Sequence, residues 1–401
     1  MHLGHLVDKE EILDKILVAV FKAPHSYTGE DLLEISCHGS PYIVRRVIQL
    51  FIRKGARSAN EGEFTLRAFL NGKIDLSQAE AISDLISSTS KTDHQLAMQQ
   101  LKGGVLNKIR SLRKKLIEFS SLIEFSLDFP EEDDSTYDKT QLSKFLIRIK
   151  KHIQTLLDSF ALGNAIKEGI SVVIVGKPNV GKSTLLNVLL NEERAIVSEI
   201  PGTTRDIIED EIIIDGIRFR FIDTAGIRNT ENRVEVLGIK KTFEKMQQAK
   251  VIFYMFDATN FKEKTVVEEI QNLHTTYTDK TIFIIANKSD LTKVKDFPYV
   301  FFSISAKKKE GIQSILKALS NTIDRSMLQN RPILTHIRHY NALHRSLKAI
   351  CNIEKGIQEN HSGDLLAVDI RQALESMGEI SGEISSEELL KNIFSKFCIG
   401  K

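Results

Sequence analysis

Gly176-Lys177-Pro178-Asn179-Val180-Gly181-Lys182-Ser183 is the stretch that decides the fold, because it lies between a predicted strand and a predicted helix. The strand is the apolar β-branched run Ile170–Val175, and the helix opens at Thr184–Leu190. The stretch matches the G-x-x-x-x-G-K-[ST] pattern, whose glycines turn backbone N–H groups toward phosphates. We predict that Lys182 reaches the β- and γ-phosphates of a nucleotide and that the Ser183 hydroxyl ligates Mg²⁺. The nucleotide-binding residues predicted here are Asn179, Val180, Gly181, Lys182, Ser183 and Thr184.

Three more apolar runs follow this loop, at Phe219–Ile222, Val251–Phe256 and Thr281–Ala286, with helical stretches between them. This alternation predicts a parallel sheet with crossover helices. Before and after it, the residues are mostly helix formers with apolar positions three or four apart. We therefore predict an α/β P-loop GTPase domain inserted into an all-α helical domain and preceded by a partial α+β N-terminal domain. The predicted boundaries are 1–73 for the N-terminal domain, 74–165 and 331–401 for the helical domain, and 166–330 for the GTPase domain.

Composition narrows the class of protein. The 401 residues include 42% hydrophobic residues and carry a net charge of only +2, from 55 basic and 53 acidic side chains. Such a chain can bury a core, and its overall charge does not indicate nucleic-acid binding. The basic run from Lys102 to Lys115 reads most simply as a solvated helix face, although a local basic patch remains compatible with it. Three scattered cysteines and no apolar run near the roughly 20 residues of a membrane span predict a soluble, cytoplasmic protein without membrane association.

Two further motifs complete a guanine-nucleotide site. Asp223-Thr224-Ala225-Gly226 follows an apolar run, as expected of a carboxylate near Mg²⁺ and a glycine that senses the γ-phosphate. Asn287-Lys288-Ser289-Asp290 follows another, and its Asp290 carboxylate can accept hydrogen bonds from guanine N1–H and the 2-amino group. ATP would leave that carboxylate unpaired. A third wall is predicted at Ser305, Ala306 and Lys307.

The motifs offer several candidates for the residues that drive hydrolysis. Many small GTPases place a glutamine after D-x-x-G, whereas here Ile227 follows Gly226. Glu235 is one nearby replacement, beside Arg228 and Arg233. Thr204 is the favoured threonine to complete the Mg²⁺ shell, and Arg205 is either catalytic or a simple surface charge. A monovalent cation held by Asn179 is a further alternative to an arginine finger.

Outside the nucleotide motifs, three segments resemble the bacterial MnmE (TrmE) family of tRNA-modification GTPases. They are Ala23–Asp31, Gly62-Glu63-Phe64 through Ala68–Leu76, and the terminal Phe397-Cys398-Ile399-Gly400-Lys401. The resemblance covers nearly the whole chain. It implies an N-terminal folate-binding and dimerising domain, a helical domain, and a GTPase domain inserted into it.

The resemblance also implies roles for individual residues. Glu235 would orient the attacking water, beside Lys182 and Arg205, which are catalytic candidates from the motifs themselves. Without the resemblance, Glu34 and Lys73 read as ordinary surface charges. The implied site residues are Asn179, Ser198, Ile200 and Thr203 for K⁺; Ser183 and Thr204 for Mg²⁺; Ser198, Thr203 and Thr204 around the nucleotide; Glu34, Lys73 and Lys401 for folate; and Cys398 near the modification site.

The implied reaction is a 5-carboxymethylaminomethyl-type modification of the wobble uridine of tRNA. It would use a one-carbon unit from 5-formyl- or methylene-tetrahydrofolate and a FAD-dependent partner called MnmG (GidA). Family members form homodimers and, with the partner, a heterotetramer. They usually carry a further βαβ-like stretch before the region that matches Ile12, so we expect incomplete folate and dimer contacts here. The alternative function is a GTP switch that binds ribosomal RNA in ribosome assembly, which would require a basic, Gly-rich appendage.

Overall fold

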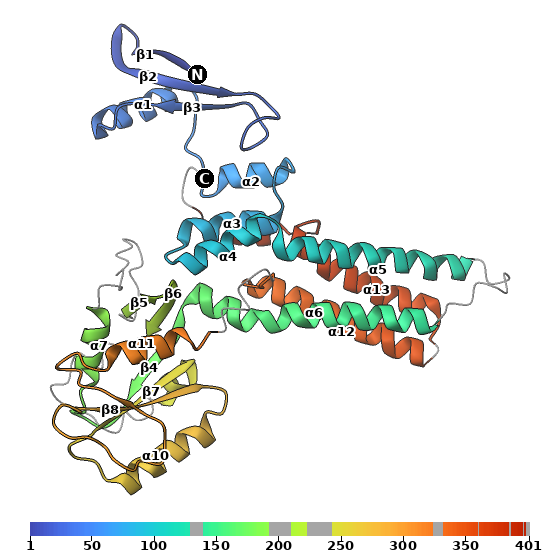
Figure 1. The fold of residues 1–401 in the computed structure, drawn as a ribbon. Coiled ribbons are helices and arrows are strands. Elements are labelled where there is room, and N and C mark those ends of the chain that lie inside the picture. Colours follow the sequence, from blue (N-terminus) through green and yellow to red (C-terminus); the bar gives the residue numbers. More distant parts are fainter. Residues whose placement is uncertain are drawn as a thin grey trace. The chain divides into compact units, whose positions relative to one another are not determined.

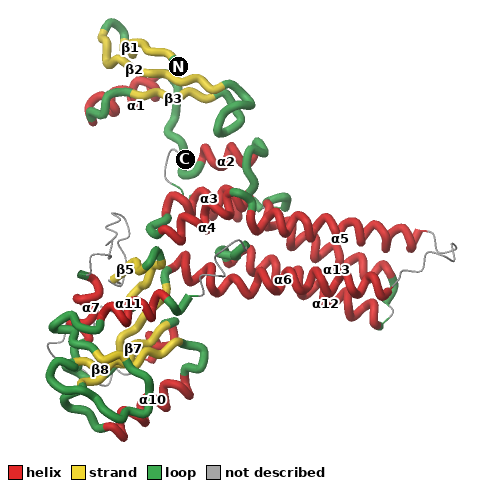
Figure 2. The backbone as a smooth tube through the Cα atoms, viewed as in Figure 1, coloured by secondary structure: helices red, strands yellow, loops and turns green. Residues whose placement is uncertain are grey.

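The chain was analysed as a computed structural model, which describes residues 1–128, 139–191, 210–222, 243–323, 332–359, 361–384, 386–395 and 397. It divides into two compact units, shown as a ribbon in Figure 1 and by secondary structure in Figure 2. Unit 1 comprises Met1–Ser87, Ala97–Gln154 and Arg338–Lys401, and unit 2 comprises Ser88–Leu96 and Thr155–Ile337. Among the described helices, none is long and apolar enough to cross a bilayer.

Unit 2 is built on a six-stranded sheet of order β5-β6-β4-β7-β8-β9. β4 lies at its centre, parallel to β6 and β7, and all six of its residues are buried. The neighbouring β7–β8 and β8–β9 pairs are also parallel. The strands are β4 (Ile170–Val175), β5 (Asp210–Ile214), β6 (Ile217–Phe221), β7 (Val251–Asp257), β8 (Thr281–Asn287) and β9 (Phe302–Ser303).

The predicted parallel sheet is confirmed for these strands, while β5 differs. It pairs antiparallel with β6 through a tight turn at Asp215-Gly216, whose residues both have positive φ. Two residues are too few for the crossover that a parallel pair needs, so the hairpin must be antiparallel. Helices α7 (Lys182–Leu190), α10 (Glu263–Thr276) and α11 (Ile312–Ser320) complete the unit, together with the adjoining parts of α4 and α6.

Unit 1 begins with an antiparallel sheet of order β1-β2-β3 and helix α1. Strands and a helix together confirm the α+β composition predicted for this region, whereas the sequence did not predict β1, most of whose residues are exposed. The elements are β1 (His2–Asp8), β2 (Glu11–Phe21), β3 (Leu32–Ser36), α1 (Pro41–Arg53) and α2 (Glu63–Leu70).

The rest of unit 1 is helical, as predicted. The long helices α5 and α13 pack along one another, and buried leucines and isoleucines of α5 line that contact. The helices are α3 (Leu76–Ser87), α4 (Lys91–Leu101), α5 (Gly104–Asp128), α6 (Lys139–Glu168), α12 (Ile337–Gln358), α13 (Gly363–Ser381) and α14 (Glu387–Phe394). α4 and α6 each run from one unit into the other in the chain.

A buried ion pair ties α3 to the first turn of α12. Arg338 Nε and Nη2 donate to the two carboxylate oxygens of Glu80, at 2.9 and 2.8 Å. His339 Nε2 lies 2.8 Å from Glu80 Oε2, and the imidazole is fully buried. Arg338 Nη2 also donates to the backbone carbonyl of Ile380 at the end of α13. One guanidinium therefore holds three helices that are far apart in sequence.

We expect Glu80→Ala to destabilise unit 1 by about 3 kcal/mol, because it removes a buried carboxylate and leaves the half-buried Arg338 guanidinium without its counter-charge. Faster hydrogen exchange of α12 backbone amides, measured during a urea titration, would report the loss. Glu359→Ala is the matched control, since Glu359 pairs with Lys355 on the surface and such pairs contribute about 0–1 kcal/mol. Equal effects of the two substitutions would contradict the assigned role of Glu80.

Candidate functional site

The predicted phosphate loop lies between β4 and α7, and its two glycines are sterically required. Gly176 has φ +145°, and a Cβ there would lie 2.1 Å from the backbone oxygen of Met255. Gly181, the N-cap of α7, has φ +101°, and a Cβ there would lie 2.3 Å from Asn287 Nδ2. Asn179 has φ +63°, a left-handed conformation that asparagine tolerates better than most residues. The backbone therefore folds tightly at the start of a helix, where N–H groups and the helix dipole attract anions.

Lys182 curls back over this loop. Its amine donates to the carbonyls of Gly176 and Lys177, at 2.7 and 2.8 Å. Burial lowers the pKa of this amine from its ordinary value. The amine is thus held next to the backbone of the predicted phosphate loop. Ser183 and Thr184 follow in the first turn of α7.

Asn287 joins the phosphate loop to the loop after β9. The side chain is buried, with its Nδ2 donating to Val180 O at 2.8 Å. Its Oδ1 accepts the backbone N–H of Ala306 at 2.9 Å. Both polar atoms of the amide are therefore satisfied by two different loops. The sequence predicts that Asn287 binds nucleotide, whereas here its side chain braces the walls of the site.

Asp290 and Lys288 lie at the same end of β8. Hydrogen bonding from Ser305 lowers the pKa of Asp290, and Lys308, 3.7 Å away, lowers it further. The carboxylate is therefore ionised near neutral pH and can accept two N–H donors of a purine. Lys288 has φ +65°, and its amine pairs with Asp257 at the end of β7.

Sequence reasoning missed Asp257. Burial raises the pKa of the Asp257 carboxyl, but hydrogen bonds from Lys288 and from Thr259 outweigh burial, so the pKa is lowered from its ordinary value. The signal was present, since Asp257 ends a buried strand next to β8, with Asp257 paired to Asn287 in the register. Carboxyl ends of parallel strands are where ligands bind in open α/β sheets.

The remaining nucleotide and cation residues fall outside the described part of the chain. Within it, the structure brings together the residues of three loops. Those it places at this edge are Asn179, Val180, Gly181, Lys182, Ser183, Thr184, Asn287, Lys288, Asp290, Ser305, Ala306 and Lys307. Those outside the described residues are Ser198, Ile200, Thr203, Thr204, Arg205, Asp223, Thr224, Ala225, Gly226, Glu235, Cys398 and Lys401.

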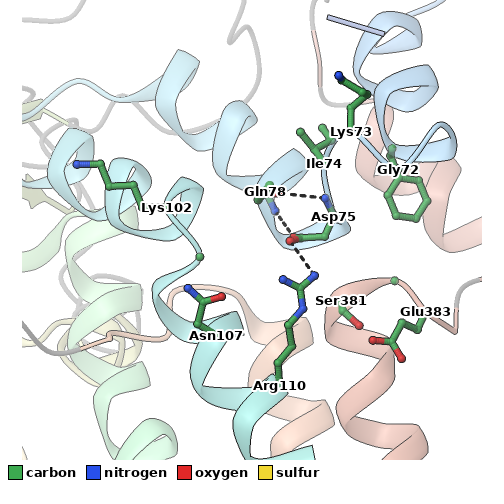
Figure 3. Close-up of a pocket in the computed structure, with 13 residues that line it drawn as sticks. Gly72, Lys73, Ile74, Asp75, Gln78, Lys102, Asn107, Arg110, Ser381 and Glu383 are labelled. Atoms are coloured by element: carbon green, nitrogen blue, oxygen red, sulfur yellow. Dashed lines mark hydrogen bonds and ion pairs between the residues drawn. The ribbon is translucent and has the colours of Figure 1, made fainter. Parts of the chain in front are cut away.

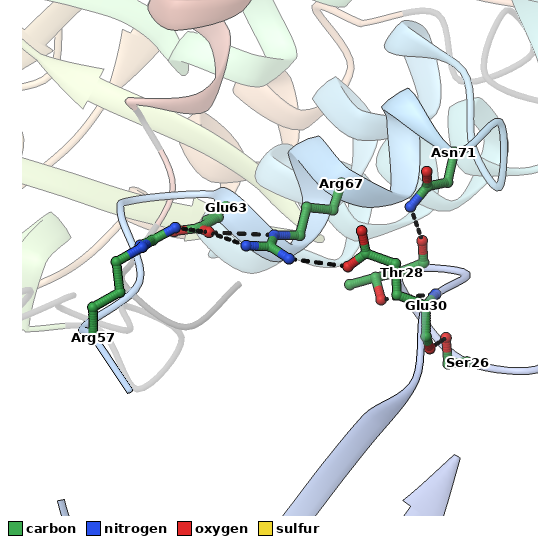
Figure 4. A network of polar contacts seen from close by, with 7 residues as sticks. All are labelled: Ser26, Thr28, Glu30, Arg57, Glu63, Arg67 and Asn71. Atoms are coloured by element: carbon green, nitrogen blue, oxygen red, sulfur yellow. Dashed lines mark hydrogen bonds and ion pairs between the residues drawn. The ribbon is translucent and has the colours of Figure 1, made fainter. Parts of the chain in front are cut away.

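A charged network joins the two N-terminal segments that carry the family resemblance (Figure 4). Glu63 accepts hydrogen bonds from Arg57 and Arg67, and Arg57 foremost holds the pKa of this carboxyl well below its usual range. Arg67 also donates to Glu30 at 3.0 Å. Asn71 Nδ2 donates to the carbonyl of Thr28 at 2.8 Å. The loop before β3 is thereby fastened to α2.

Two of the predicted folate residues, Glu34 and Lys73, lie in unit 1, while Lys401 lies outside the described residues. Glu34 is an exposed residue of β3, while the Lys73 amine donates to the carbonyl of Pro24 at 2.8 Å. Lys73 also lines a cleft of about 460 Å³ (Figure 3). In that cleft Asp75 accepts from the Gln78 backbone and pairs with Arg110, and burial raises the pKa of its carboxyl. The cleft offers donors and acceptors to a polar ligand.

Family models match almost the whole chain. The model described as MnmE helical domain matches residues 76–398, and the one described as GTP-binding protein TrmE N-terminus matches residues 1–73. Among similar proteins, one named tRNA modification GTPase MnmE from Flavobacterium johnsoniae is 53% identical over 414 residues, covering 100% of this chain and 89% of that protein. Its namesake from Bacteroides thetaiotaomicron is 46% identical over 412 residues, covering 99% and 88%.

Solved structures give a weaker likeness. The G domain of FeoB from Methanococcus jannaschii aligns with a TM-score of 0.27 and 22% identity, covering 38% of this chain and 96% of that one. A TM-score this low supports no conclusion about function.

We expect Asp290→Asn to lower GTP affinity by about 1–3 kcal/mol, roughly tenfold to a hundredfold, because an amide cannot accept both purine donors. Xanthosine triphosphate, whose C2 carries an acceptor, should then bind better than GTP. Nucleotide titrations followed by fluorescence measure both affinities. Asp279→Asn, an exposed acid in the same unit, is the control and should change neither. An unaltered preference for GTP in Asp290→Asn would remove Asp290 from base recognition.

Proposed function

This chain belongs to the MnmE family of tRNA modification GTPases, and we propose that it couples K⁺-assisted GTP hydrolysis to a 5-carboxymethylaminomethyl-type modification of the wobble uridine. The observation that supports this most is the assembly of three nucleotide loops around Asn287. Identity along the whole chain with proteins named tRNA modification GTPases favours this reaction over a ribosomal-RNA switch.

The residues of this chain divide the work of GTP binding. The amides of the loop 176–183 face the phosphates, and Lys182 leaves its two carbonyl partners to pair with them. Asp290 reads the guanine edge, while the stem of Lys288, anchored by Asp257, lies beside the base. We assign Glu235 to orienting the attacking water and Arg205 to the transition-state charge. Positioning and charge neutralisation supply most of the catalysis in phosphoryl transfer.

The metal sites follow from the same loops. Ser183 and Thr204 would hold Mg²⁺, which neutralises the charge that develops on the β- and γ-oxygens. The position of Ser183, one residue after Lys182 in the first turn of α7, fits that ligand. Asn179, Ser198, Ile200 and Thr203 would hold K⁺. Of these four residues, only Asn179 lies in the part of the chain that the structure describes. Its left-handed backbone at the loop tip is compatible with an oxygen ligand for K⁺ near the phosphates.

We further propose that residues 1–73 bind a reduced folate and form a homodimer. Glu34, Lys73 and Lys401 would contact the folate, which supplies the one-carbon unit, and Cys398 would lie near the modification site. Exposed apolar side chains on the N-terminal sheet, among them Leu3, Ile12 and Leu33, support a surface that another copy covers. A partner subunit with bound FAD, MnmG, would complete a heterotetramer.

The domain assignment is part of this proposal. We assign 1–73 to folate binding and dimerisation, 74–165 with 331–401 to the helical domain, and 166–330 to the GTPase domain. The helical domain would carry the nucleotide-driven movement of the GTPase domain to the folate site.

We expect this chain to restore modified wobble uridine in cells that lack its gene. Mass spectrometry of tRNA nucleosides measures that restoration directly. Lys182→Ala, produced at equal abundance, should restore none, because GTP turnover would be lost with the amine. Normal wobble modification in the cells without the gene would contradict the proposed reaction.

We expect GTP hydrolysis to be at least about tenfold faster in KCl than in NaCl of equal ionic strength, because K⁺ stands where other enzymes use an arginine finger. Asn179→Gly should lose most of that difference, since it removes the side-chain carbonyl yet accepts the positive φ. Steady-state phosphate release measures both. Identical rates in the two salts would count against the K⁺ site and leave the GTPase itself standing.

A further inference from the structure

A row of basic side chains lies along the seam between α5 and α6 in unit 1. The rings of Phe119 on α5 and Phe145 on α6 are in contact, with centroids 5.8 Å apart. The two helices run in opposite directions (Figure 1), so the helical rise from the Phe119–Phe145 contact puts Lys115 level with the turn of Arg148, and Lys108 further along, beyond His152. The residues that we call the basic seam are Lys108, Lys115, Lys144, Arg148, Lys151 and His152.

The charges of the seam act on one another across the two helices. Burial lowers the pKa of His152, and the positive charges of Lys108, Lys115 and Lys151 lower it further. Lysines of α5 are thus close enough to act electrostatically on the imidazole of His152 on α6. All six side chains except Lys108 are exposed, and Lys108 is half-buried.

The seam differs from the other basic residues of the same helices. Arg110 pairs with Asp75, Arg113 pairs with Glu383, and Lys150 pairs with Glu354. In contrast, within the described part of the chain no carboxylate forms an ion pair with Lys108, Lys115, Lys144 or Arg148. An ordinary solvated face intersperses charges of both signs, whereas this one concentrates a single sign that repels itself.

Such a concentration fits an extended polyanion. On α5, Lys108 and Lys115 are seven residues apart, and on α6 Lys144 and Lys151 are too, which is about 10 Å along each axis. Two parallel rows of cations can follow a phosphate backbone without reading bases. The cations of the seam have long, flexible stems, which suits backbone contact.

We propose that the basic seam of α5 and α6 binds the phosphate backbone of the tRNA substrate. This inference rests on the proposed function, since it places the tRNA of that reaction on the helical part of unit 1. The seam would contribute affinity and salt dependence, whereas the choice of tRNA would come from contacts elsewhere. It also gives two cations of the basic run from Lys102 to Lys115, Lys108 and Lys115, a more specific role than a solvated face.

The test compares the unaltered chain with a seam variant, Lys108→Gln/Lys115→Gln/Arg148→Gln, in binding labelled tRNA at several KCl concentrations. The seam variant should bind tRNA at least about tenfold more weakly than the unaltered chain. The slope of log Kd against log salt concentration should become smaller by about two to three, which is about one for each lost phosphate contact. Its GTP hydrolysis without tRNA should equal that of the unaltered chain.

The matched control is Lys264→Gln/Lys348→Gln/Arg371→Gln, which removes the same charge from three exposed positions elsewhere. It should keep tRNA affinity within about twofold. If the seam variant keeps the tRNA affinity and salt slope of the unaltered chain, the seam does not bind tRNA. Loss of binding to a protein partner in that variant would not change this conclusion. Equal losses in the seam and control variants would also overturn the proposed role of the seam, since net charge alone would then explain binding. Absence of saturable tRNA binding by the unaltered chain would overturn the proposed function as well.

Discussion

The buried amide of Asn287 is the contact on which the nucleotide site depends. Its two ends are fixed by the carbonyl of Val180 and the N–H of Ala306, which belong to loops more than a hundred and about twenty residues away in sequence. A buried amide with both atoms bonded is costly to displace, because either loop would then carry an unsatisfied polar group. Gly181 must lack a side chain for this amide to come so close. The phosphate loop and the base-reading loop are therefore set in register by one side chain.

The neighbouring strand extends that arrangement. The register of β7 with β8 places Asp257 beside Asn287, and Asp257 in turn holds Lys288. The backbone at Lys288 takes a left-handed conformation, which costs a non-glycine residue of order 1 kcal/mol and persists only where the surroundings fix it. The ion pair and the strand register supply that constraint. The strand ends therefore fix the backbone of the predicted base-binding loop, and a loop that is already ordered has less ordering cost on binding.

Sequence predicted the elements whose signals are local. β4, β7 and β8 are continuous apolar runs, and the phosphate loop is set by its glycines, so their positions could be read directly. β1 could not be, because an exposed strand is specified by its pairing with β2 rather than by the burial of its own residues. The brace made by Asn287 was missed for the same reason. The motif indicates that an asparagine is needed, whereas only the tertiary structure shows which loops its amide joins.

The division of the chain into two units also depends on tertiary contacts that the sequence does not reveal. Residues Ser88–Leu96 cluster with the sheet unit although helical sequence surrounds them. The reason is a backbone contact, in which Thr92 N–H donates to Gly216 O at 3.2 Å, with Lys91 packed over that glycine. Because the β5–β6 turn receives the N-terminal part of α4, Ser88–Leu96 belong to the sheet unit, while Ala97–Leu101 of the same helix belong to unit 1. Helix propensity alone could not reveal that division, because a tertiary contact assigns the segment to the sheet.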